Sequence, residues 1–237
     1  MNDLAVVLLS GGLDSATCLY TAREAGFKIT AVSFDYGQRH RNELMAAANL
    51  AQIAGAEHVI LPVDLRRIGG SALTSATAVP KGGDGIGKEN NVPVTYVPVR
   101  NLIFLSLAYA VAETREARAI YIGINAVDYS GYPDCRPDFI ASFRETAALA
   151  SKAGREGRTP EIRTPLVNLS KAQIAREAMR LAVPVALTWT CYDPQTKGGF
   201  FVPCENCDAC ILRSRGFAEA GLALSKEEIF GAPIRSA

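Results

Sequence analysis

Residues 4–20, LAVVLLSGGLDSATCLY, decide the fold of this chain. Leu4–Leu9 is an unbroken apolar run, which is typical of a parallel strand buried on both faces. The glycine pair that follows permits a sharp turn. Ser15–Ala25 then has the pattern of a helix that stops at Gly26, a residue suited to a helix end. A strand, a glycine turn and a helix in this order predict the first unit of an α/β protein.

The same alternation of strand and helix patterns runs along most of the chain. Further strands are expected at Lys28–Phe34, His58–Asp64 and Ala119–Asn125, and helices at Arg41–Ala54, Asn101–Thr114, Pro137–Ala153 and Lys171–Leu181. Ser170 is a suitable N-cap for the last of these helices. We therefore predict an α/β fold with a doubly wound, mostly parallel sheet covered on both faces. Such a fold places ligands at the carboxyl ends of its strands.

The composition is that of a globular protein. The 237 residues include 25 Lys and Arg against 24 Asp and Glu, so the formal net charge is +1, and 49% of the residues are hydrophobic. These values exclude a disordered chain and a strong global field toward nucleic acid or an anionic membrane. The longest apolar stretch, Leu102–Ala112, is too short to span a bilayer, and Met1–Ala5 contains no basic leader. We expect a cytoplasmic protein without a membrane or a direct nucleic-acid partner.

Residues 66–93 interrupt the alternation. Arg66–Pro93 is rich in Gly, Ser, Thr and Asn and shows neither the helical nor the strand period. Two interpretations are equally supported, a flexible surface loop and a lid over the ligand site. Gly82 to Lys88 resembles a Walker A loop, but Glu89 stands where Ser or Thr is required, so we reject that motif. We predict an α/β domain over residues 1–185 and a C-terminal zinc-binding helical segment over residues 186–237.

The turn Ser10-Gly11-Gly12-Leu13-Asp14-Ser15 has the features of a phosphate site. The glycines leave backbone N–H groups unobstructed, the helix N-terminus adds unpaired donors, and the two serines add hydroxyl groups. Asp14 alone would repel phosphate, which favours a Mg²⁺ ion bridging the carboxylate and the phosphate. The competing interpretation is a tight turn with an Asp-Ser cap and no ligand. The position directly after the first buried strand favours phosphate binding.

Cysteines crowd the C-terminal part of the chain, at Cys191, Cys204, Cys207 and Cys210. Four soft thiolate ligands at short spacing suit a closed, tetrahedral and therefore structural Zn²⁺ site. An iron–sulfur cluster is one alternative, although the Cys-Pro that follows the third cysteine of a ferredoxin run is absent. Buried free thiols are the other. Cys18 is expected in the core, and no base that would activate Cys135 is evident.

Several segments together carry a resemblance to a known family. Ser-Gly-Gly-x-Asp-Ser after a first strand resembles the loop of the PP-loop ATP pyrophosphatases, which implies an adenine nucleotide alpha hydrolase-like fold. Within them, the chain resembles the 7-cyano-7-deazaguanine synthases of queuosine biosynthesis through Phe34–His40, Tyr96–Asn101, Asn125–Pro137 and Thr188–Tyr192. The resemblance implies an ATP-dependent carbon–nitrogen ligase that converts 7-carboxy-7-deazaguanine and ammonia to the 7-cyano compound through an adenylated acid and an adenylated amide.

The same resemblance implies a homodimer and zinc at the four cysteines. The chain departs from the expected pattern in two places. A longer loop separates Cys191 from Cys204, and Glu205 stands where Gly is expected. Both departures affect the surface beside the metal site rather than its ligands.

Residue chemistry and the resemblance together give a predicted site. The nucleotide-binding residues are expected to be Leu9, Ser10, Gly11, Gly12, Leu13, Asp14, Ser15, Ala16, Thr17, Cys18 and Leu19. The predicted substrate-binding residues are Asp128, Tyr129, Tyr132, Asp134, Arg136 and Asp138. A flat purine-like ring needs aromatic faces and carboxylates for its N–H groups, while an ordered loop held by Asx turns is the competing interpretation. Asp14, Arg100 and Lys171 are the predicted catalytic residues, the two cations because they would stabilise charge on phosphate.

Three other functions stay open. A sibling PP-loop ligase would act on another carboxylate or thiolate tRNA, using the same first loop. A non-catalytic zinc ribbon would bind nucleic acid, which the near-zero net charge disfavours. A redox iron–sulfur protein would be coloured and would contain iron.

Overall fold

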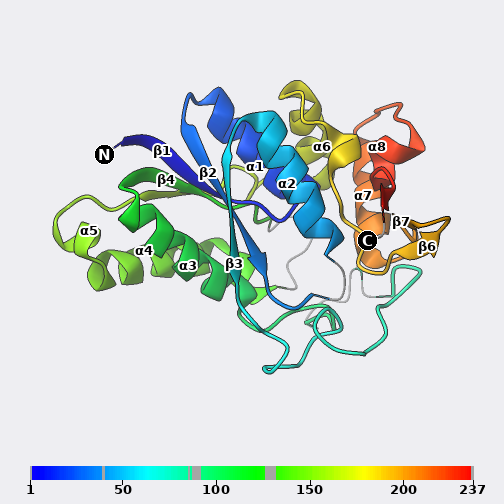
Figure 1. Cartoon of the computed structure of the whole chain (residues 1–237), viewed down its shortest axis with the longest axis horizontal. Coiled ribbons are helices and arrows are strands. Elements are labelled where there is room, and N and C mark those ends of the chain that lie inside the picture. Colours follow the sequence, from blue (N-terminus) through cyan, green and yellow to red (C-terminus); the bar gives the residue numbers. More distant parts are fainter. Residues whose placement is uncertain (1, 39–40, 85, 87–91, 126–131, 236–237) are drawn as a thin grey trace.

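The computed structural model describes residues 2–38, 41–84, 86, 92–125 and 132–235. Its centre is a five-stranded sheet in the order β3-β2-β1-β4-β5, in which every neighbouring pair is parallel (Figure 1). The strands are β1 (Asn2–Leu8), β2 (Lys28–Asp35), β3 (Glu57–Pro62), β4 (Ala117–Tyr121) and β5 (Glu161–Arg163). The helices around them are α1 (Leu13–Glu24), α2 (Asn42–Ala54), α3 (Arg100–Thr114), α4 (Pro137–Ala150), α5 (Lys152–Arg155) and α6 (Lys171–Arg180).

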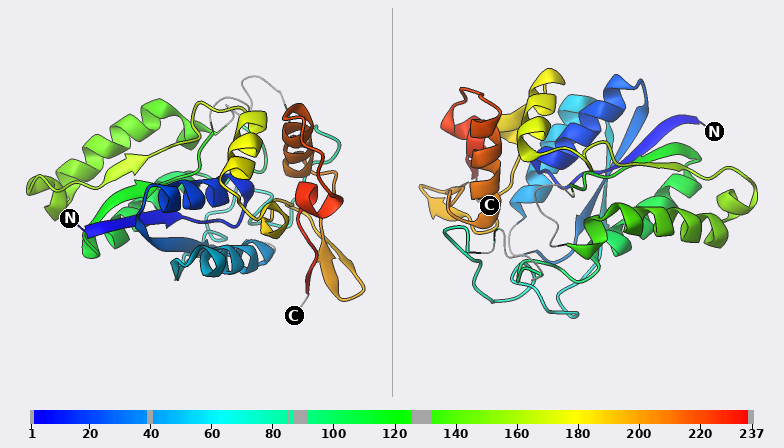
Figure 2. Two further views of the ribbon diagram at one scale, coloured as in Figure 1. Left: turned by 90° about the horizontal axis from the view of Figure 1, so that it is seen from above. Right: turned by 180° about the vertical axis from the view of Figure 1, so that it is seen from behind.

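Alternate residues of β1 pack into two different cores. Ala5 and Val7 are buried with apolar side chains of α1, α2 and α6, whereas Val6 and Leu8 are buried with those of α3 and α4. Figure 1 shows these helices on opposite sides of the sheet, and Figure 2 shows the same layers from above and from behind. Because both faces of β1 are covered, an unbroken apolar run forms this strand. The predicted doubly wound, mostly parallel fold is confirmed.

The strand order reverses direction between β1 and β4. From β1 the chain proceeds to β2 and β3 on one side, while β4 and β5 lie on the other. The carboxyl ends of β1 and β4 therefore face a crevice, the usual place for a ligand in such a sheet. Gly123, just after β4, allows the close approach of this segment to α1, because a Cβ there would lie 3.0 Å from the carbonyl carbon of Asp14.

Most predicted elements are confirmed, although β3 and β4 end at Pro62 and Tyr121, before the predicted ends at Asp64 and Asn125. Gly26 and Gly55 have φ values of +79° and +70° at the ends of α1 and α2. Ser170 caps α6 in a reciprocal box with Gln173. The predicted single helix over 137–153 is wrong, because Ser151 is extended and instead caps α5 by accepting from Gly154 N at 3.0 Å.

The C-terminal segment combines short elements that the sequence analysis did not predict. They are η2 (Val185–Leu187), β6 (Gln195–Lys197), β7 (Phe200–Val202), α7 (Asp208–Glu219), α8 (Lys226–Phe230) and β8 (Ile234–Arg235), and the three strands form an antiparallel sheet. Helix α7 packs closely on α6, since a Cβ at Gly216 would lie 2.8 Å from the Cβ of Lys171. Phe217 of α7 is buried in the same core as Ile174 of α6. A boundary at residue 185 stays a prediction.

The described part of residues 66–93 contains no helix or strand, but it is attached to the C-terminal segment. Ala72 and Val79 are buried in one cluster with Trp189. Gly82 N donates to Asn206 O at 2.9 Å, and Lys81 Nζ lies 2.6 Å from a carboxylate oxygen of Asp193. Movement of this segment as a lid stays a prediction.

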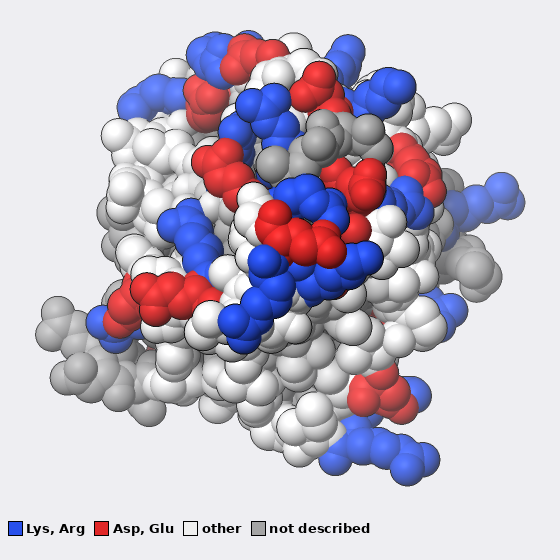
Figure 3. Space-filling view, turned by 90° about the vertical axis from the view of Figure 1, so that its left-hand side faces the viewer, with Lys and Arg blue, Asp and Glu red and all other residues white. Residues whose placement is uncertain are grey.

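The described surface carries mixed charge. On the face shown in Figure 3, Lys and Arg side chains lie among Asp and Glu side chains. Exposed ion pairs include Arg180 with Glu24 at 2.7 Å and Arg118 with Asp3 at 3.2 Å. Exposed pairs of this kind contribute little to stability. No helix among the described residues is both long enough and apolar enough to cross a bilayer.

Truncation of the α6 core contact should destabilise the fold. Ile174 is fully buried in the core that α6 shares with α1 and α7, whereas Met179 on the same helix is 38% exposed. We expect Ile174→Ala to lower the free energy of unfolding by about 2–5 kcal/mol because it leaves a cavity. Met179→Ala should change it by less than about 1 kcal/mol. Urea unfolding followed by circular dichroism measures both, and equal losses in the two variants would contradict the packing described here.

Candidate active site

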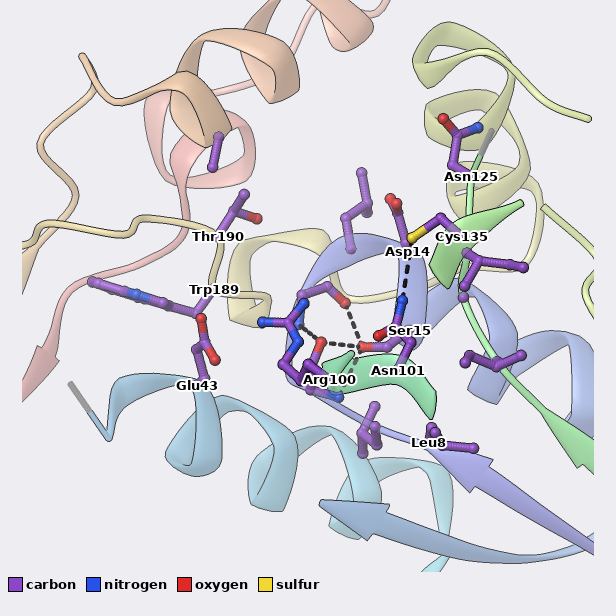
Figure 4. Close-up of a pocket in the computed structure, with 18 of the residues that line it drawn as sticks. Leu8, Asp14, Ser15, Glu43, Arg100, Asn101, Asn125, Cys135, Trp189 and Thr190 are labelled. Carbon is purple, nitrogen blue, oxygen red and sulfur yellow. Dashed lines mark hydrogen bonds between the residues drawn. The ribbon is translucent and has the colours of Figure 1, made fainter. Parts of the chain in front are cut away.

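A cavity of about 310 Å³ opens at the carboxyl ends of β1, β2 and β4. Its wall consists of the glycine turn after β1, the first turns of α2, α3 and α6, and the chain around Trp189 (Figure 4). Strand ends and helix starts thus meet at one point, as the reversal of strand order requires. Asp14, Arg100 and Lys171, which are 157 residues apart at most, all line this cavity.

The glycine turn is held by its own serines. Ser15 Oγ donates to Gly12 O at 3.0 Å and accepts from Ser10 N at 3.2 Å. The two hydroxyl oxygens lie 3.1 Å apart. Gly12 is the N-cap of α1 and supplies no side-chain acceptor, so the first N–H groups of α1 face the cavity without a side-chain cap. Such an N-terminus is suited to binding an anion.

Asp14 and Lys171 form an ion pair at the edge of the turn. Lys171 Nζ donates to Asp14 Oδ2 at 2.6 Å, and both side chains are about three-quarters buried, with 24% and 25% of their surface exposed. Ser170 fixes the start of α6 and thereby places Lys171. The glycine turn contains no lysine of its own, so a neighbouring helix supplies the cation that the local sequence lacks.

Aromatic side chains and Arg100 form the opposite part of the cavity. The guanidinium carbon of Arg100 lies 5.8 Å from the centroid of the Tyr36 ring, and Tyr132 and Tyr192 also line the wall. Burial acts to lower the pKa of Arg100, but the neighbouring tyrosines and Glu43 outweigh it and raise the pKa above its ordinary value. Burial raises the pKa of Tyr36 and of Tyr192 as well. Arg100 therefore stays charged, and Tyr36 and Tyr192 stay neutral.

Glu43 is a cavity residue that the sequence analysis missed. It lies in the first turn of α2, and its main chain abuts the glycine turn, since a Cβ at Gly11 would lie 2.3 Å from Glu43 O. Burial raises the pKa of its carboxyl group to about 7, although Arg100 acts to lower it. No motif singles out Glu43, because only the fold brings α2 to this edge.

Most of the further residues that the sequence analysis missed belong to segments that carried the family resemblance. The wall includes Gln38, Asn101, Asn125, Trp189, Thr190 and Arg213. Asn101 Nδ2 donates to Cys135 Sγ at 3.2 Å (Figure 4). Burial raises the pKa of the Cys135 thiol to about 12, so this thiol is not an activated nucleophile. The motifs that contain the first five of these residues were the available signal.

The predicted nucleotide-binding residues divide into two groups. Leu9, Ser10, Gly12, Leu13, Asp14 and Ser15 line the cavity. Gly11 faces α2 instead, while Ala16, Thr17, Cys18 and Leu19 have no exposed surface and are absent from the described wall. Thr17 Oγ1 donates to Leu13 O at 2.8 Å within the helix. The side chains of these last four residues pack in the core and hold α1 in place. They do not themselves line the described cavity wall.

The predicted substrate-binding residues are also separated by the structure. Asp128 and Tyr129 lie outside the described residues. Tyr132 lines the cavity, and its hydroxyl oxygen lies 3.0 Å from Thr95 Oγ1. Asp134 is buried and accepts from Asn101 N at 2.9 Å, so its carboxylate caps α3. Arg136 and Asp138 are exposed, pair with each other at 3.6 Å and do not contribute to the described wall, because α4 directs both outward.

The four C-terminal cysteines come together beside the cavity. The sulfur atoms of Cys191, Cys204, Cys207 and Cys210 lie within 4.8 Å of one another. Cys204 N donates to Cys191 Sγ at 3.2 Å, and Cys207 N donates to Cys204 Sγ at 3.3 Å. Four ligands about 2.3 Å from one tetrahedral zinc ion would lie about 3.8 Å apart, so this arrangement fits a closed metal site.

Comparisons with known proteins identify relatives over most of the chain. Three relatives named 7-cyano-7-deazaguanine synthase, from Sphingopyxis alaskensis, Novosphingobium aromaticivorans and Desulfatibacillum aliphaticivorans, are each 56% identical to this chain. The alignments cover 92%, 92% and 93% of this chain and 95%, 91% and 94% of those proteins.

Solved structures resemble the chain at much lower identity. One is the NMN synthetase of Francisella tularensis, which is 18% identical with a TM-score of 0.47 over 95% of this chain and 81% of that one.

The sequence pattern of the queuosine biosynthesis protein QueC matches residues 4–221. The chain therefore belongs to the QueC family of queuosine biosynthesis proteins.

Proposed function

We propose that this chain converts 7-carboxy-7-deazaguanine and ammonia to 7-cyano-7-deazaguanine with ATP as the activating reagent. The observation that carries the proposal is the shared cavity. It joins an uncapped helix N-terminus, an Asp14–Lys171 pair and an aromatic wall with Arg100. The first feature suits phosphate and the aromatic wall suits a flat heterocycle. The names of the relatives state the product.

The reaction removes two poor leaving groups in succession. The substrate carboxylate attacks the α-phosphate of ATP, which gives an acyl adenylate and pyrophosphate. Ammonia then displaces AMP and loses one proton, so an amide forms. A second ATP adenylates the amide oxygen with loss of an N–H proton. Departure of AMP with loss of the remaining N–H proton leaves the nitrile. Both cycles need positioning and charge stabilisation rather than a nucleophilic side chain.

The residues of the cavity have distinct roles in this scheme. The N–H groups at the start of α1 would bind the pyrophosphate part of ATP. Lys171 and Arg100 would stabilise charge that develops on the α-phosphate. The carboxylate of Asp14 is an oxygen donor of the kind that Mg²⁺ prefers, and a bound Mg²⁺ would neutralise charge on the phosphates.

The four cysteines would hold a structural Zn²⁺ ion. The ligand set is complete, since four thiolates leave no position for a reacting water. Lys81 and Gly82 of the 66–93 segment contact the chain between these cysteines, at Asp193 and Asn206. The metal would therefore fix the C-terminal segment and the attachment of residues 66–93 to it. A homodimer and a cytoplasmic location stay predictions from the family resemblance.

Mass spectrometry of the products tests the proposed function directly. Purified protein incubated with ATP, Mg²⁺, ammonia and 7-carboxy-7-deazaguanine should yield the 7-cyano compound, with AMP and pyrophosphate. A sibling ligase would leave this heterocycle unchanged. Absence of product and of pyrophosphate under these conditions would refute the proposal.

Removal of the Asp14 charge should abolish nucleotide chemistry without unfolding the protein. Asp14→Asn should lower kcat/KM by about 100- to 1,000-fold, because Lys171 and the divalent cation lose their carboxylate partner. Asp3→Asn makes the same change at the other end of β1, at an exposed side chain paired with Arg118, and should leave kcat/KM unchanged. Pyrophosphate release and thermal unfolding report on the two properties. Full activity in Asp14→Asn would exclude a role in catalysis.

Loss of one metal ligand should affect stability first. Cys207→Ser should bind less than one zinc per chain and lose several kcal/mol of unfolding free energy, since a structural metal is bound only by the folded state. Cys135→Ser, outside the cluster, should keep its zinc. Elemental analysis and urea unfolding measure these effects. Stoichiometric iron in the wild-type protein, or unchanged stability in zinc-free Cys207→Ser, would contradict a structural zinc site.

A further inference from the structure

The carboxyl group of Glu43 has no assigned role, and the only described charge that acts on it is that of Arg100. It lines the cavity beside Arg100 and Trp189 (Figure 4). It forms no hydrogen bond or ion pair with any described residue. A carboxyl group that is partly buried without a partner is costly, which indicates that it is kept for a ligand.

The surroundings of Glu43 restrict that ligand to a flat molecule. Arg100, Tyr36 and Tyr192 are the charged and titratable groups that influence it, from α3 and from the segments after β2 and η2. Two of the three are aromatic, and the indole of Trp189 belongs to the same wall. A planar ring system would stack or wedge between such side chains and present its edge to the carboxylate.

Other carboxylates near the cavity are already engaged. Asp134 caps α3, Asp138 lies outside the wall, and Asp14 is paired with Lys171. Asp208, the remaining carboxylate of the described wall, is buried at the start of α7 next to Cys207 of the four-cysteine cluster. Glu43 is thus the carboxylate of the described wall that the proposed phosphate chemistry does not use and that stands next to aromatic rings.

A guanine-type ring has the edge that matches this carboxylate. Its N1–H and its 2-amino group are neighbouring donors that point in nearly the same direction, and an ionised carboxylate has two acceptor oxygens with the same spacing. We propose that Glu43 accepts hydrogen bonds from N1–H and the 2-amino group of the heterocycle and so selects a guanine-type ring; this inference rests on the proposed function.

The arrangement of charges supports this orientation. The acid group of the substrate is attached to the five-membered ring, on the side away from N1 and the 2-amino group. With its pyrimidine edge at Glu43, the ring would present that acid group away from the Glu43 carboxylate and toward the rest of the cavity. The reverse orientation would place two carboxylates together, which is unfavourable.

The position of Glu43 is fixed by the backbone. Gly11 lies so close to Glu43 O that no larger residue fits, and Glu43 lies in the first turn of a helix of 13 residues. Recognition by a group held in this way costs little side-chain ordering on binding. Since burial raises the pKa of Glu43 to about 7, its two-acceptor form is lost as the pH falls below that value. Heterocycle binding should weaken in the same range.

Two enzymes and two substrates provide the test. Wild-type protein and Glu43→Gln are assayed with 7-carboxy-7-deazaguanine and with the analogue that lacks only the 2-amino group. Wild type should prefer the guanine-type substrate by on the order of 100-fold in kcat/KM, because the analogue leaves an acceptor oxygen unpaired. In Glu43→Gln the preference should fall below about 10-fold, while the KM for ATP stays the same. Glu145→Gln, on the exposed side of α4, is the matched control and should behave as wild type.

Each result has a defined meaning. Failure of wild type to use either heterocycle refutes the proposed function itself. An equal loss of activity on both substrates in Glu43→Gln would show a purely structural role and overturn this inference. A raised KM for ATP with an unchanged substrate preference would overturn it too, since Glu43 would then contact the adenine. A loss of heterocycle affinity below about pH 7 that is absent from Glu43→Gln supports it, and an unchanged pH profile in the variant counts against it.

Discussion

The close approach of Gly11 to the first turn of α2 is the constraint on which the site depends. The φ of Gly11 is +86°, and a Cβ there would lie 2.3 Å from Glu43 O, so only glycine fits. In addition, Trp189 of the C-terminal segment donates a hydrogen bond from its backbone N to Gly11 O at 2.8 Å. A single peptide turn thereby joins the end of β1, the start of α2 and the C-terminal segment. The backbone donors of α1 and the side chain of Glu43 owe their relative positions to this contact.

The fold was predictable wherever a repeating pattern of burial dictates structure. Alternate side chains of β1 enter two different cores. Because both cores are apolar, residues 4–8 of this strand are all apolar, and the sequence alone indicated a central parallel strand. β5 escaped prediction because it has three residues, of which only Ile162 is fully buried. It exists because its register with β4 supplies hydrogen bonds. The antiparallel sheet of β6–β8 is equally short and exposed, and pairing across the chain, not local pattern, produces it.

For the site, sequence reasoning succeeded where the chemistry is local and failed where it is assembled. The Ser10–Ser15 turn and the four-cysteine cluster were recognisable because their groups are close in sequence. The Asp14–Lys171 contact spans 157 residues and only the packing of α6 on α1 creates it. Asp134 had the right chemistry for a substrate contact, but α3 begins at Arg100 without a side-chain cap from Val99, and the Asp134 carboxylate fills that need.

The balance of charge in the cavity explains why the turn relies on backbone groups. The charged residues of the described wall are Asp14, Glu43 and Asp208 against Arg100, Lys171 and Arg213. Arg213 is committed to the carbonyl oxygens of Val185 and Glu228, at 2.9 and 3.0 Å, and Lys171 is held by Asp14. Little positive charge is left over for a triphosphate, so N–H groups at the start of α1 and a divalent cation would supply most of its binding. Backbone groups bind phosphate without regard to the acceptor substrate. Selectivity for that substrate must then reside in side chains brought from other elements, and α2 contributes Glu43, the carboxylate of the described wall that stands beside Arg100 and the aromatic rings.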